Sequence, residues 1–155
     1  MDFRITGLSA DRFSHLFGLP DEELARHDAV RVVADARPGF PDRIALREAE
    51  IGERLLLLNY THQPADNPYR ASHAIFVLEG AQEMYSQVGE IPEVLRTRCI
   101  SLRAFDERHL MIDADLVQGV DLEEVIGRMQ ANSSVAYLHA HYAKRGCYAA
   151  RIERA

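Results

Sequence analysis

The sequence predicts an α+β fold, with a mostly antiparallel sheet or a partial barrel and a few helices. Short apolar runs follow one another directly, and helical patterns are confined to the N-terminal part and to a segment near residue 120. Strands in succession with helices set apart from them are typical of α+β folds rather than alternating parallel folds. The 155 residues, 47% of them hydrophobic, contain no repeat and no linker, so we expect one domain spanning residues 1–155.

The N-terminal part predicts a short strand followed by two short helices. Residues 3–5 alternate with polar neighbours, as a half-buried strand does. Ser9 is suited to cap a first helix that ends at Gly18. Pro20 lies near the start of a second helix, with acidic residues in its first turn. We expect these helices to pack as a pair.

The central part predicts two apolar strands around a long polar loop. Residues 30–35 form a β-branched run that indicates an earlier strand, whereas residues 44–50 fit a helix or a strand equally well. The four leucines of residues 55–58 indicate a buried strand. The polar residues 59–73 follow, and "AIFVLEG" resumes the apolar pattern. A loop of this length in a compact domain is usually functional or internally tied.

The C-terminal half predicts three further elements after a loop with a helical turn. "CISLRAFD" and "HLMIDADLV" indicate adjacent strands joined by a tight turn at residues 106–108. "DLEEVIGRMQAN" is the clearest helix, with Asp121 as its cap and Glu124 completing a capping box. Residues 135–142 and 147–152 form the last predicted hairpin.

Charge and composition exclude several classes of partner. The formal net charge is −6 and the pI is about 5.6, which disfavours binding to nucleic acid and to anionic membranes. No apolar run reaches the roughly 18 residues of a membrane span, and the N-terminus has no secretory pattern. We therefore expect a cytoplasmic protein whose Cys99 and Cys147 stay reduced. The oligomeric state is left open by the sequence.

The HAH motif of the last hairpin is a candidate metal site. On a strand, Tyr137, His139 and His141 share one face, and the two imidazoles lie one pleat repeat of about 6.6 Å apart. His62 or His73, from the two ends of the polar loop, can supply a third nitrogen to a divalent metal, and Asp66 an oxygen instead. The competing interpretation is a hydrogen-bonded or solvated histidine face.

Two other constellations carry candidate chemistry. Cys147 follows Lys144 and Arg145, and nearby cations favour a nucleophilic thiolate, with His139 or His141 as the base. Alternatively, Cys147 is a small buried apolar residue. Arg70, Ser72 and Arg145 carry donors suited to a phosphate or carboxylate. Arg70 can instead pin the loop by pairing with Asp66 or with backbone carbonyls.

The stretches "HQPADNPYRAS" and "AKRGCYAARIERA", together with "VVADARPGFP" and "GERLLLL", resemble the bacterial domain-of-unknown-function family numbered 1203. The resemblance implies a single-domain protein of about this length and no established activity. It also implies glycine at the position of His73 and cysteine at that of Asp42 in other members. His62 is therefore the better third ligand.

The leading functional hypothesis is a polar pocket that either binds or both binds and turns over a small anionic or polar metabolite. We expect the 59–73 loop to fold over the C-terminal hairpin, so that His62, Arg70, Tyr137, His139 and His141 line one pocket. One alternative is a non-catalytic interaction protein in which this loop is a structural clasp. A second alternative is a metal-dependent enzyme built on the HAH strand.

Overall fold

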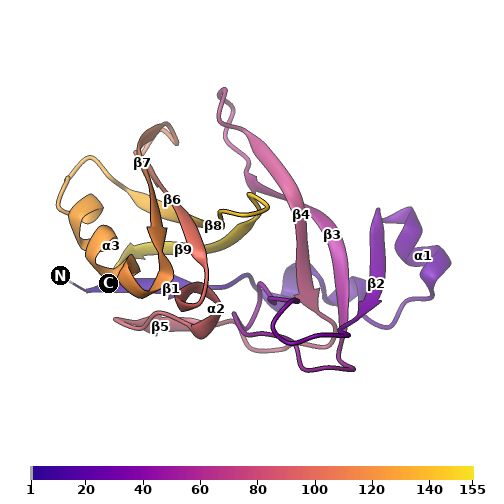
Figure 1. The fold of residues 1–155 in the computed structure, drawn as a ribbon. Coiled ribbons are helices and arrows are strands. Elements are labelled where there is room, and N and C mark those ends of the chain that lie inside the picture. Colours follow the sequence, from indigo (N-terminus) through magenta and orange to yellow (C-terminus); the bar gives the residue numbers. More distant parts are fainter. Residues whose placement is uncertain (1) are drawn as a thin grey trace.

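Two antiparallel sheets stand next to each other in the computed structural model, which describes residues 2–155 (Figure 1). The larger sheet has the strand order β5-β1-β9-β8-β6-β7. Its strands are β1 (Phe3–Thr6), β5 (Ser86–Val88), β6 (Cys99–Phe105), β7 (Met111–Gln118), β8 (Tyr137–Tyr142) and β9 (Tyr148–Arg154). Every pairing is antiparallel, as the sequence predicted, and both sheets are open at their edges.

The smaller sheet has the order β2-β3-β4 and contains the leucine run. Its strands are β2 (Ala29–Val33), β3 (Arg54–Gln63) and β4 (Ala71–Leu78). Leu56 and Leu58 of β3 face Val77 and Ile75 of β4 across the ladder, and all four are buried. Because side chains alternate along a strand, this face continues through Tyr60 toward His62.

The helices are short and are not interleaved with the strands of either sheet. They are the 3₁₀ turns η1 (Ala10–Arg12), η2 (Ser14–Leu16) and η3 (Gly119–Asp121), and the α-helices α1 (Asp21–Arg26), α2 (Glu93–Arg96) and α3 (Leu122–Gln130). Helix α3 covers the larger sheet, and Leu122, Ile126 and Met129 pack with that sheet's apolar residues (Figure 1). The fold is therefore α+β, with its helices segregated from its strands. Among residues 2–155, no helix is both long enough and apolar enough to cross a membrane.

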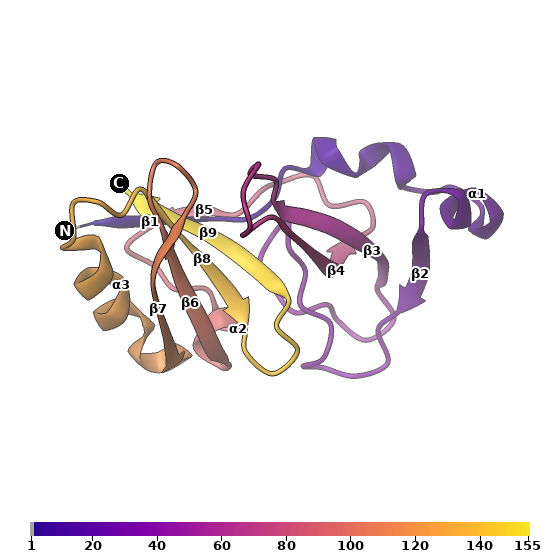
Figure 2. The same ribbon diagram turned by 90° about the horizontal axis from the view of Figure 1, so that it is seen from above.

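The hairpin β8–β9 joins the two sheets. Tyr148, the first residue of β9, is buried in the same apolar cluster as Leu56, Leu58, Ile75 and Val77 of the smaller sheet. Figure 2 shows the two sheets meeting along this hairpin and strands β3 and β4. The side chains that alternate toward this junction come from both sheets, and they include the histidines of the predicted site.

Three local predictions were wrong. Residues 9–18 form two 3₁₀ turns instead of one helix, although Ser9 does accept a hydrogen bond from the Asp11 amide at 3.3 Å. Asp121 precedes α3 but makes no side-chain capping bond. The polar loop is shorter than residues 59–73, because β3 runs to Gln63 and β4 begins at Ala71. Cross-strand pairing with apolar neighbours draws polar residues of both loop ends into the ladder.

Candidate metal centre

Strand β8 places His139 and His141 on one buried face. All six residues of the strand are buried, and the two imidazole rings are 6.3 Å apart between centroids, close to one pleat repeat. Tyr137 shares this face, and its ring centroid lies 5.2 Å from that of His139. The predicted alternation of the HAH strand is therefore correct.

His62 reaches the same point from β3. Its ring centroid lies 4.8 Å from that of His141 and 6.3 Å from that of His139. The pairing of β3 with β4 shifts between Tyr60 and Gln63, and His62 sits at this irregularity. Tyr148 stacks on the His62 ring, with centroids 5.7 Å apart and planes 7° from parallel. The stacked tyrosine fixes the plane of the imidazole.

The three imidazoles bring one ring nitrogen each to a common point. These nitrogens all lie within 4.8 Å of one another. The rings are 9%, 3% and 1% exposed for His62, His139 and His141, respectively. Each has a buried nitrogen with no hydrogen-bond partner among the described residues: Nδ1 of His62, Nδ1 of His139 and Nε2 of His141. Buried polar atoms normally have partners, so three unpaired nitrogens in one cluster are an unusual feature of this region.

The tautomer of His141 is fixed by its backbone contact. Its Nδ1 lies 2.9 Å from the Gly146 carbonyl oxygen, which can only accept, so Nδ1 carries the proton and donates it. In the neutral ring, Nε2 then keeps its lone pair. An imidazole held by a carbonyl at one nitrogen and offering the other is the usual arrangement of a metal-ligating histidine.

Burial keeps all three imidazoles neutral. Desolvation, together with smaller effects of neighbouring arginines and histidines, lowers the pKa of His139 to about 2, that of His141 to about 3 and that of His62 to about 4. Histidines with such pKa values are poor proton carriers at neutral pH, because proton transfer works best near the operating pH. Metal binding needs the deprotonated nitrogen, and these rings supply it without releasing a proton.

Two arginines flank the cluster. Arg103 of β6 is paired with His139 in one ladder, and Arg151 of β9 is paired with it in the other. Arg103 donates to the Ser101 hydroxyl, and Arg151 donates to Glu153 while lying over the Tyr137 ring at 3.9 Å. Neither arginine was predicted from the sequence. They could have been found by pairing the HAH strand with its neighbours, since residues opposite each other share a face.

Tyr137 belongs to a hydrogen-bond network at the edge of the cluster. Its hydroxyl accepts from Nε2 of Gln63 at 3.0 Å and lies 2.7 Å from Nδ1 of His109. Gln63 follows His62 on β3, and His109 lies in the turn between β6 and β7. This network holds the end of β3 against the larger sheet.

Arg70, Ser72 and Asp66 lie outside the cluster. All three are exposed, and Arg70 donates from Nη1 to the Pro64 carbonyl at 2.7 Å. This contact is the one that a loop-pinning arginine makes. Among the described residues, no hydrogen bond joins Arg70 to a histidine ring. The structure thus assembles four of the five predicted pocket residues, and ligand binding by Arg70 or Ser72 stays a prediction.

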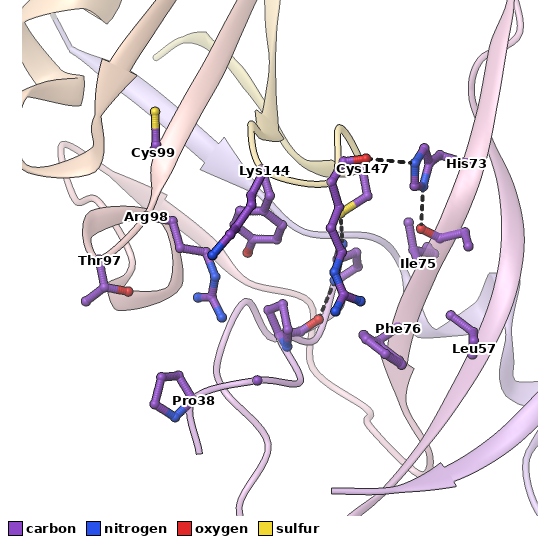
Figure 3. A pocket seen from close by; sticks show the side chains of 16 residues that line it. Pro38, Leu57, His73, Ile75, Phe76, Thr97, Arg98, Cys99, Lys144 and Cys147 are labelled. Atoms are coloured by element: carbon purple, nitrogen blue, oxygen red, sulfur yellow. Dashed lines mark hydrogen bonds between the residues drawn. The ribbon is translucent and has the colours of Figure 1, made fainter. Parts of the chain in front are cut away.

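Cys147, His73 and Arg145 belong to a different region, a cleft on the other side of the hairpin turn (Figure 3). The Cys147 sulfur is 3.1 Å from Nη2 of Arg43, and His73 Nε2 is 3.2 Å from the Arg145 carbonyl oxygen. No hydrogen bond connects Cys147 with His139 or His141 in residues 2–155. A cysteine nucleophile served by those histidines is therefore unsupported by the geometry.

The comparison with known families decides where the chain belongs. The family described as proteins of unknown function, DUF1203, matches residues 39–154. The chain belongs to this family. The matched part of the chain contains all three clustered histidines and both flanking arginines. No curated protein and no solved structure matches the chain, so the chemistry of the site rests on its own residues.

Proposed function

We propose that this protein binds one divalent metal ion through His62, His139 and His141. The observation that carries the proposal is a cluster of three buried imidazoles that bring one ring nitrogen each within 4.8 Å of the others, and each ring has a buried nitrogen with no hydrogen-bond partner among the described residues. Imidazole suits zinc, copper, iron and nickel, and three neutral histidines are an established zinc ligand set. An ordered water at the same point is the competing explanation for the unpaired nitrogens.

The spacing of the nitrogens fits an ion after a small contraction. Tetrahedral coordination with Zn–N bonds of 2.0–2.1 Å places two ligand nitrogens about 3.3 Å apart. The nitrogens here lie within 4.8 Å of one another, so the rings need to approach by roughly 1.5 Å at most. Rotation about the side-chain torsions of the three histidines can supply a shift of this size. No backbone rearrangement is required.

The surrounding charge favours an anion at the remaining coordination position. Three neutral imidazoles leave the full 2+ charge on the ion, and the cluster itself contains no carboxylate. Arg103 and Arg151 add positive charge from both neighbouring strands. Hydroxide or a small anionic ligand would therefore complete the site best. When bound, the ion would act as a Lewis acid, which suits hydration or hydrolysis of a small substrate.

Metal analysis of untagged protein tests the proposal. We expect close to one equivalent of zinc or another transition metal after purification without chelators. Adding cobalt(II) to the chelator-treated protein should give the visible absorption of a four-coordinate site. His139→Gln and His141→Gln should weaken binding by at least a hundredfold. His73→Gln, a histidine of the neighbouring cleft, is the matched control and should bind like the wild type.

The outcome that contradicts the proposal is specific. If wild type and His139→Gln retain equal, substoichiometric metal, and no metal raises the thermal midpoint of the wild type, the unpaired nitrogens bind water. A true ligand present at 100 times its dissociation constant adds about 2.7 kcal/mol to the free energy of unfolding. A shift of that size is readily measured for a chain of this length.

A further inference from the structure

A second site lies in the cleft on the opposite side of the hairpin turn from the histidines. The cleft has a volume of about 660 Å³, within the range of small-molecule sites. Its walls come from residues 38–43, from β3 and β4, from the start of β6 and from the turn between β8 and β9. Figure 3 shows His73, Ile75 and Phe76 on one wall and Arg98, Cys99 and Lys144 on the other. None of the three clustered histidines lines it.

The cleft gathers positive charge in a protein whose net charge is −6. Arg43, Arg98, Lys144 and Arg145 all line it. Arg98 pairs with Glu48, which is the one carboxylate in contact with these four cations among the described residues. Three cations are thus left without an acidic partner in residues 2–155. Such a surplus attracts an anion.

Arg43 is the most unusual of these residues. It is 1% exposed, yet no carboxylate of the described residues lies within 4.0 Å of it. Its guanidinium donates to the carbonyl oxygens of Tyr148 at 2.8 Å and Pro41 at 2.5 Å, and to the Cys147 sulfur at 3.1 Å. Sulfur is a weak acceptor, and two of the five N–H groups have no partner among the described residues. Arg43 therefore has two N–H groups that can donate hydrogen bonds to an oxyanion.

The rest of the lining is apolar and aromatic. Leu57 and Phe76, which face each other across the β3–β4 ladder, contribute apolar surface from the smaller sheet. The Tyr142 ring lies between the guanidinium groups of Arg43 and Arg98, at 4.9 Å and 5.0 Å from its centroid. This arrangement holds the two cations in fixed positions. An inorganic ion would leave most of the apolar wall in contact with water.

We propose that this cleft binds a small organic oxyanion, such as a carboxylate or a phosphate monoester, through its charged end. The head group would accept hydrogen bonds from Arg43 and Arg98, and Lys144 and Arg145 would attract it at the rim. Its apolar body would lie along Leu57 and Phe76. The site is distinct from the metal centre, because Tyr142 lines the cleft whereas the preceding residue of β8, His141, points to the opposite face.

Calorimetric titration with four matched probes tests the proposal. Phenylacetate and phenyl phosphate carry an apolar body with the two kinds of oxyanion, phenylacetamide removes the charge, and inorganic phosphate removes the body. We expect saturable binding of at least one organic anion, at least tenfold tighter than that of phenylacetamide or inorganic phosphate. The two organic anions distinguish a carboxylate site from a phosphate site.

Variants assign the binding to the cleft. Lys144→Gln combined with Arg145→Gln changes only exposed residues and should weaken binding about tenfold without affecting folding. Arg98→Gln should weaken it further, and the exposed Arg26→Gln is the matched control. The proposal would be overturned if the double variant and Arg98→Gln both bound the organic anion as tightly as the wild type. It would also be overturned if the wild type bound phenylacetamide as tightly as the organic anions. His139→Gln, with or without chelator, should bind the anion normally, which separates this site from the metal centre.

Discussion

Acidification of the metal-free protein should destabilise it through the buried histidines. The pKa of His139 is lowered to about 2 and that of His141 to about 3, mainly by desolvation. In the unfolded chain a histidine titrates near pH 6.5, so below that pH the unfolded state binds more protons and the free energy of unfolding falls. The loss continues until the pH reaches the folded-state pKa. Each group costs about 1.4 kcal/mol per pH unit in this window.

Between pH 6.5 and pH 5 the two deeply buried rings together cost about 4 kcal/mol, roughly 2 kcal/mol each. His62 adds to this loss, with a smaller depression of its pKa to about 4. A loss of this size is a large part of the stability of an ordinary domain. Urea denaturation at pH 7 and pH 5, in the presence of EDTA, measures it directly.

The variant His139→Gln isolates the contribution of one ring. Its free energy of unfolding should fall by about 2 kcal/mol less than that of the wild type over the same pH range, because glutamine does not titrate. All other titrating groups cancel in this difference. His27→Gln removes an exposed histidine and should follow the wild type. If His139→Gln and the wild type lose equal stability, burial does not keep His139 neutral and the reasoning fails.

Three further outcomes follow from the packing. Arg43→Ala should cost at least about 3 kcal/mol in urea denaturation, because it leaves buried acceptors unpaired and opens a cavity; a loss below 1 kcal/mol would contradict the packing described. Gly119→Ala should lower the free energy of unfolding by about 2 kcal/mol or more, because a Cβ there would lie 1.8 Å from the Leu95 carbonyl oxygen. Its control is Gly127→Ala in α3, where a Cβ meets nothing within 4 Å and should raise the free energy of unfolding by about 0.5–1 kcal/mol. Arg70→Gln should leave metal binding unchanged and speed amide exchange in residues 64–70, and weaker metal binding would place Arg70 at the centre after all.

The strands, and the placement of His139 and His141 in the candidate metal centre, were predictable because they depend on local periodicity. The alternation of side chains along a strand is enough to place His139 and His141 on one face. The arrival of His62 depends on how the smaller sheet packs against the hairpin and on an irregularity in the ladder at residues 60–63. Neither feature has a local pattern. The sequence could only nominate His62 beside His73, which lies in the cleft instead.

Of the second site, the sequence nominated Arg145 as an anion-binding residue but neither Arg43 nor Arg98, for a related reason. Its most buried cation, Arg43, lies in a segment with bends and a single bridge, Pro41–Glu48, where no periodicity indicates which side chains point inward. All but one of the eighteen basic residues are arginines, so Arg43 could not be distinguished from the others by type. The lining of a cleft between two sheets is set by long-range packing. Residue types and spacings do not encode it locally.

The position of β1 has a consequence for how the chain folds. This strand lies between β5 and β9, and the amide of Ala155 donates to the carbonyl oxygen of Asp2 at 3.0 Å. During synthesis, residues 3–6 emerge from the ribosome well before residues 148–154, so one of the two neighbours of β1 is missing until β9 has been made. Pairings this distant in sequence also slow the search for the native topology. Until then the N-terminal strand has an open edge, which is the state most exposed to wrong pairing.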